Sequence, residues 1–209
     1  DSFNTAIGYQ TGLNLTTGVQ NTLIGGLAGD AITTGSYNSL VGVNAGGALT
    51  TGAQNVAFGQ GALASNTTGA TNTALGDSSL AANTTASNNT AVGQAALGAN
   101  TTGERNVAVG ALALDANTVG TRNVALGYGS LTADTKGSRS IAIGDAALQT
   151  QNFTSATEVY NVAVGYAAGA SVTTGTYNTL IGGLAGDSIT TGVRNTTMGY
   201  ASGGQLTTG

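Results

Sequence analysis

A repeat of 17 residues runs through this chain and limits its fold more than any other feature. Its signature is the pentapeptide Asn-x-(Ala/Leu)-(apolar)-Gly, in which the fourth residue is large and apolar and the fifth is always glycine. Numbered from the asparagine as position 1, the twelve units begin at residues 4, 21, 38, 55, 72, 89, 106, 123, 140 (a serine), 161, 178 and 195. Every step is 17 residues except the one of 21 after residue 140. Such a period is typical of proteins in which each unit packs only against its neighbours.

The period fits one coil of a parallel β-solenoid. Two strands of about five residues and two turns use 17 residues, and coils in such a fold stack about 4.8 Å apart. No segment shows the 3.6-residue apolar spacing of a helix. We therefore predict an all-β parallel β-solenoid of twelve 17-residue coils, the last one incomplete. Residues 1–209 form a single repetitive segment with one insertion within 149–160.

The glycine at position 5 is expected to form a structural corner of every coil. Glycine suits a corner where φ is positive or where two backbones approach closely. These glycines are Gly8, Gly25, Gly42, Gly59, Gly76, Gly93, Gly110, Gly127, Gly144, Gly165, Gly182 and Gly199.

Two further positions indicate one narrow core shared by all units. In units 1–3 and 10–12, position 9 is glycine and position 12 is Leu, Ile or Val, as in Gly29 and Ile32. In units 4–9, position 9 is leucine and position 12 is Asn, Asp or Gln, as in Leu97 and Asn100. Each unit thus supplies one large apolar group here, as a core of fixed volume requires.

The strand itself is apolar on both faces, which predicts self-association. In residues 106–110, Asn-Val-Ala-Val-Gly, positions 2, 3 and 4 are all apolar, although neighbouring side chains of a strand point to opposite faces. Only one face can point into the coil, so stacking leaves an apolar stripe larger than soluble monomers usually expose. A parallel homo-oligomer packed along the stripe is the direct remedy, and the residues alone do not give its number.

These units resemble known fibre repeats. Asn-Val-Ala-Val-Gly at 106–110 and Ser-Ile-Ala-Ile-Gly at 140–144 resemble the repeats of trimeric autotransporter adhesin heads. The longer form at 89–103 is similar to arrays in phage tail fibres and bacterial surface proteins that often end in an endosialidase-type chaperone domain. The resemblance implies a left-handed parallel β-roll, a homotrimer, and a structural or adhesive role in an extracellular fibre, on a bacterial cell surface or a virion tail. Because the repeats run to both ends, we expect a fragment of a longer fibre.

Aromatic and basic residues recur at two positions and are candidate contacts to a host-surface glycan or protein. Tyrosine stands at position 6 or directly before position 1, and all four arginines stand directly before position 1, near Glu104, Asp115 and Asp134 as possible ion-pair partners. A rim around the oligomer interface and a row of ion pairs are alternative roles for them. Phe153 lies in the insertion, which solenoids commonly loop outward. The candidates are Tyr9, Tyr37, Tyr128, Tyr160, Tyr166, Tyr177, Tyr200, Arg105, Arg122, Arg139 and Phe153, with Arg194 as the fourth arginine.

Composition argues against most other functions. The chain has no His and no Cys, and its only lysine is Lys136, so we expect no catalysis, no cofactor and no metal site. Five basic residues are too few to bind nucleic acid, and no apolar run is long enough to enter a membrane. An ice-binding solenoid that uses its regular Thr rows is the alternative function. A polysaccharide-processing fibre is a third hypothesis, and the lack of a carboxylate cluster in the sequence counts against it.

Overall fold

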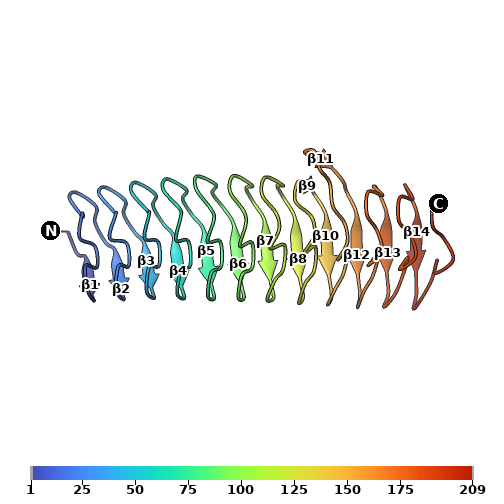
Figure 1. The fold of residues 1–209 in the computed structure, drawn as a ribbon, viewed down its shortest axis with the longest axis horizontal. Coiled ribbons are helices and arrows are strands. Elements are labelled where there is room, and N and C mark those ends of the chain that lie inside the picture. Colours follow the sequence, from blue (N-terminus) through green and yellow to red (C-terminus); the bar gives the residue numbers. More distant parts are fainter. Residues whose placement is uncertain (1, 209) are drawn as a thin grey trace.

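The chain folds into a rod of stacked coils in which each repeat contributes one strand (Figure 1). The computed structural model describes residues 2–208, and no helix occurs among them. It is a parallel β-solenoid of about eleven turns, with coils of about 17 residues. The strands of its main sheet are β1 (Thr5–Ile7), β2 (Thr22–Ile24), β3 (Ser39–Val41), β4 (Val56–Phe58), β5 (Thr73–Leu75), β6 (Thr90–Val92), β7 (Val107–Val109), β8 (Val124–Leu126), β10 (Ile141–Ile143), β12 (Val162–Val164), β13 (Thr179–Ile181) and β14 (Thr196–Met198).

All twelve strands pair in parallel and in the order of the sequence. Each residue pairs with its counterpart one repeat later, as Ala74 does with Ala91. Across the longer step, Ala142 pairs with Ala163, so the insertion does not shift the register. Within the insertion, β11 (Thr157–Glu158) pairs with β9 (Gly137–Ser138) of the preceding coil, and this small second sheet lies at the upper edge in Figure 1.

The expectation of two five-residue strands in each coil is wrong. Each coil has one strand of three residues, and the rest of the coil is a series of turns. The turns arise because positions 7, 9 and 17 adopt positive φ, for example 59° at Leu27, 56° at Gly29 and 62° at Tyr37. The turns still bond to the next coil, since Thr33 N donates to Thr50 O at 3.0 Å. These bonds offset the cost of left-handed residues other than glycine, which is about 1 kcal/mol or more each.

Position 5 requires glycine for two reasons at once. Its φ lies between 117° and 143° in all twelve units, a range that residues with side chains rarely adopt. A Cβ added to Gly25 would also lie 2.6 Å from the carbonyl oxygen of Gly42 in the next coil. A side chain here would therefore push neighbouring coils apart.

The two kinds of unit share one backbone and fill the same core space differently. At position 9, φ is 50–54° where the residue is leucine and 56–73° where it is glycine. A Cβ on Gly29 would lie 2.7 Å from Cδ1 of Ile32, so a side chain at position 9 and a large one at position 12 collide. Where position 12 is polar, Leu63 and its equivalents take the space and are buried. This collision explains why each unit carries one large apolar group at positions 9 and 12 taken together.

The asparagines at position 1 form a buried ladder along the rod. Asn106 Nδ2 donates to the carbonyl of Gly120 in its own coil at 2.8 Å. Asn106 Oδ1 accepts the backbone N–H of Asn123 in the next coil at 2.9 Å. Each amide therefore closes its own coil and fastens it to the following one, and both backbone groups are satisfied away from water.

We predict that Asn106→Ala destabilises the rod by about 2–5 kcal/mol, because it leaves the Gly120 carbonyl and the Asn123 N–H buried without partners. Urea unfolding followed by circular dichroism measures the change. The matched control is Gln94→Ala, at an exposed site on the preceding coil. An Asn106→Ala variant as stable as the control would contradict the structural role of the ladder.

Candidate functional site

The outer face of the main sheet is a continuous strip formed by positions 2 and 4 of every strand, here called the outward strip. In β7, Ala108 at position 3 is fully buried, whereas Val107 is half-buried and Val109 is 38% exposed. Position 3 therefore points into the coil and positions 2 and 4 point out of it. With rungs about 4.8 Å apart, the strip is about 53 Å long.

The outward strip is largely apolar and uncovered in the single chain. Position 4 carries Ile, Val, Phe, Leu or Met on every rung. Position 2 is Val or Ile on β4, β7, β8, β10 and β12, and Thr or Ser on the other seven rungs. The large apolar members that are at least 36% exposed are Ile7, Val56, Phe58, Leu75, Val109, Ile143 and Met198. A row of this length exceeds the scattered apolar residues of an ordinary protein surface.

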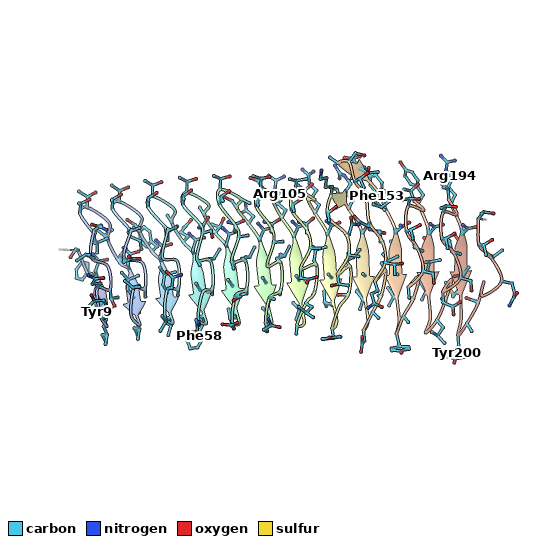
Figure 2. The ribbon with its side chains drawn as sticks, in the orientation of Figure 1. Tyr9, Phe58, Arg105, Phe153, Arg194 and Tyr200 are labelled. Atoms are coloured by element: carbon cyan, nitrogen blue, oxygen red, sulfur yellow. The ribbon has the colours of Figure 1, made fainter. Side chains whose placement is uncertain are left out.

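A column of arginine and tyrosine runs along one edge of the rod, directly before the strands. We call it the Arg–Tyr column. Its members are the residues directly before position 1 of the next unit, which is position 17 in an ordinary unit and position 21 in the unit with the insertion: Arg105, Arg122, Arg139, Tyr160, Tyr177 and Arg194. All have φ between 56° and 65°, which directs each side chain from the same point of its coil. Figure 2 shows Arg105 and Arg194 at this edge, with Phe58, Tyr9 and Tyr200 at the opposite edge.

Four members of the column stack on one another. The rings of Tyr160 and Tyr177 lie 5.5 Å apart at an angle of 13°. The guanidinium of Arg139 lies 5.5 Å from the Tyr160 ring centre, and that of Arg194 lies 5.6 Å from the Tyr177 ring centre. Both faces of each ring are therefore in contact with neighbours, so these two tyrosines present edges rather than a platform on which a sugar ring could stack.

The insertion supplies the carboxylate that fixes this stack. Arg139 Nε lies 2.9 Å from Glu158 Oε1, and the Tyr160 hydroxyl donates to Glu158 Oε2 at 2.9 Å. The hydrogen bonds from Tyr160 and Arg139 lower the pKa of the Glu158 carboxyl. The same carboxylate raises the pKa of Tyr160. Sequence reasoning missed Glu158 as a partner, because only the pairing of β11 with β9 brings it to the column.

The other arginines lack the ion pairs that the sequence suggested. Within residues 2–208, Arg139–Glu158 is the only salt bridge. Asp134 is buried in the core instead, and Asp115 accepts a hydrogen bond from the Thr132 hydroxyl. The side chains of Arg105 and Arg122 remain exposed on adjacent coils.

Phe153 is not a surface residue, which corrects the prediction for the insertion. It is only 7% exposed, and Val159 at the other end of the insertion is fully buried. The loop between them protrudes, but its apolar ends continue the packing of the coil. The remaining candidate tyrosines, Tyr9, Tyr37, Tyr128, Tyr166 and Tyr200, are each more than half exposed.

A second buried ladder ends beside the insertion. At position 12, Asn83 Nδ2 donates to Asn66 Oδ1 at 3.0 Å, and the pattern repeats up to Asn117. The next rung carries Asp134, which accepts from Gly137 N at 2.9 Å and from Gln151 Nε2 at 2.5 Å. Asn117 Oδ1 is consequently a buried acceptor with no donor among the described residues. Burial of Asp134 raises the pKa of its carboxyl above the ordinary 3.8, because burial disfavours the charged form.

The threonine pairs present a single exposed row. At position 13, the Thr50 hydroxyl donates to Thr67 O of the next coil at 3.0 Å, and most equivalents do the same. At position 14 the side chains are exposed on six successive coils: Thr17, Thr34, Thr51, Thr68, Thr85 and Thr102.

Residues 2–208 contain no group of three His, Cys, Asp or Glu placed to hold a metal ion. They also contain no helix that could cross a bilayer. No protein-family model, curated protein or solved structure matches the chain. The likeness to adhesin and tail-fibre repeats therefore stays a prediction from the residues.

We predict that Asp134→Asn stabilises the rod by about 1 kcal/mol at pH 7, because an amide can donate to Asn117 Oδ1 and carries no buried charge. The loss of Oδ2 as the acceptor for Gln151 Nε2 offsets part of this gain. The folded Asp134 carboxyl binds its proton more tightly than the unfolded one, so its contribution to stability falls as pH rises above about 3.8 and levels off above the folded pKa. The gain from Asp134→Asn should therefore be smallest in acid and largest at neutral pH.

Urea unfolding of the native protein and the variant across pH 3–8 measures this difference. Asp77→Asn, which changes an exposed carboxylate, is the control for the loss of one negative charge. A gain from Asp134→Asn that does not change with pH, or a loss of stability at pH 7, would contradict the role assigned to Asp134.

Proposed function

We propose that this chain is a structural and adhesive segment of an extracellular trimeric fibre, on a bacterial cell surface or a phage tail. Its mechanism is mechanical: identical copies pack along their outward strips into a stiff rod, and the rod repeats its outer edges at every coil. The observation that carries the proposal is the apolar outward strip of twelve rungs.

The outward strip supports self-association because it is self-complementary along its length. Position 4 is apolar on all twelve rungs, so parallel copies in the same register bring apolar rows together at every level. Closed packing around a common axis removes the rows from water without an open, growing edge. The number three comes from the resemblance to trimeric adhesin and tail-fibre repeats.

Rigidity of the single coil stack supports the mechanical part. Backbone bonds, the position 1 amides and the position 13 hydroxyls each join consecutive coils. A fibre built this way presents weak surface contacts many times, and repeated weak contacts add to firm attachment. A host-surface glycan or protein is the partner such display suits.

Sedimentation velocity should give a particle of three chain masses. We predict that Leu75→Glu with Val109→Glu, which places charges in the outward strip on β5 and β7, releases single folded chains. The reason is that a carboxylate between packed apolar rows is buried without a partner. Circular dichroism checks that the coils remain, since both side chains point out of the coil.

The matched control is Thr68→Glu with Thr102→Glu, two exposed sites with the same spacing in the position 14 row. This control should sediment as the native protein does. A native protein that is folded and monomeric at micromolar concentration would refute the fibre proposal.

Ice binding is a second candidate, favoured by the six exposed threonines of the position 14 row. A regular file of hydroxyl and methyl groups can match a lattice, but the neighbouring position 13 hydroxyls are engaged in bonds between coils. Thermal hysteresis separates the two candidates: a plain fibre gives none, and an ice-binding solenoid loses its activity when the row is changed by Thr68→Glu and Thr102→Glu.

A further inference from the structure

A depression lies on the edge of the rod where the Arg–Tyr column begins. It has a volume of about 140 Å³ and is lined by Glu104, Arg105, Thr121 and Arg122. These residues are positions 16 and 17 of two consecutive coils, so the depression is built by the stacking of one coil on the next.

The two arginines in this depression have hydrogen-bond donors that are not used within the described chain. Within residues 2–208, neither side chain forms a salt bridge or a hydrogen bond to another residue. Arg139 bonds to Glu158, and Arg194 packs on Tyr177. Within residues 2–208, Arg105 and Arg122 are therefore the members of the column whose N–H groups bond to no residue and whose guanidinium groups lie over no ring, although the charge of Arg122 acts at a distance on Glu158.

Stacking forces these two positive charges together. They occupy the same position of adjacent coils, about 4.8 Å apart along the rod at their backbones, and the fixed φ at position 17 directs both from the same point. Glu104 contributes one negative charge, but its carboxylate oxygens lie more than 4.0 Å from the guanidinium nitrogens of Arg105 and Arg122. With two arginines and one glutamate, the lining has a net positive charge. An oxyanion placed between two guanidinium groups accepts hydrogen bonds from both and relieves their repulsion.

We infer that this depression binds the carboxylate or sulfate group of an acidic polysaccharide. The inference rests on the proposed adhesive function and names the ligand class for that edge of the fibre. A polymer suits the site better than a small molecule, because both arginines are exposed at the edge of the rod, and because an oligomer presents several copies of the depression to one chain of sugar.

Binding of the full chain to sulfated dextran, with neutral dextran and inorganic sulfate as comparison ligands, tests the inference by calorimetry at low ionic strength. We expect sulfated dextran to bind, neutral dextran not to bind, and added salt to weaken binding. Arg105→Gln with Arg122→Gln should weaken binding about tenfold or more, since it removes two charge-assisted contacts.

Two controls separate a site from general charge. Arg194→Gln also removes a positive charge from the column, but outside the depression, and should leave most of the affinity. Glu104→Gln should strengthen binding, because it removes the one carboxylate from the lining, whereas Asp77→Asn, elsewhere on the surface, should change it less.

Three outcomes overturn the inference: no binding of sulfated dextran, equal losses for Arg194→Gln and the double variant, or inorganic sulfate binding as tightly as the polymer. Sedimentation of each variant keeps this result separate from the fibre proposal. A monomer that binds sulfated dextran through Arg105 and Arg122 refutes the fibre and leaves the site, whereas an oligomer that dissociates on the double change and binds no polymer shows that a second copy covers these arginines.

Discussion

Hydrogen bonds between residues one repeat apart hold the rod together, and they form only if every coil stacks in register on the next. This requirement explains residues that look costly in isolation. Tyr37 and Leu27 keep left-handed backbones because the bonds of the coils on either side fix them. Gly25 has no side chain because the carbonyl of Gly42 occupies the space. Asn106 is buried because its amide serves two backbone groups that no water reaches.

The same stacking explains why the side chains available for contacts with other molecules lie on the outside of the rod. Each coil buries one or two large apolar groups and a few alanines, so the interior is filled and thin. The surface positions that recur at every coil include the outward strip, the position 14 row and the Arg–Tyr column. Repetition converts single residues there into lines: apolar on the strip, hydroxyl on the threonine row, and cationic or aromatic on the Arg–Tyr column. A fibre has use for such lines, since contacts repeated along a rod add up.

The sequence predicted features that depend on the repeat alone and missed those that depend on how a coil bends. The 17-residue rung, the parallel order and the absence of helix follow from the period. The single three-residue strand could not be foreseen, because the positive φ of Leu27 or Arg105 has no glycine to mark it. The inward Phe153 and the Glu158 clamp lie in the one segment outside the period, where no neighbouring unit offers a comparison. The stack from Arg139 to Arg194 could have been predicted, since four successive units end in Arg, Tyr, Tyr and Arg directly before the next position 1.

The central claim is that the outward strip is covered in solution by identical copies lying in parallel. Mass per unit length, obtained from small-angle X-ray scattering of the rod, tests it most directly, because it counts the chains that pass through one cross-section. Three chains per rung of about 4.8 Å is the value expected. One chain per rung in a folded, soluble sample would contradict it, since the apolar residues of twelve strands would then face water.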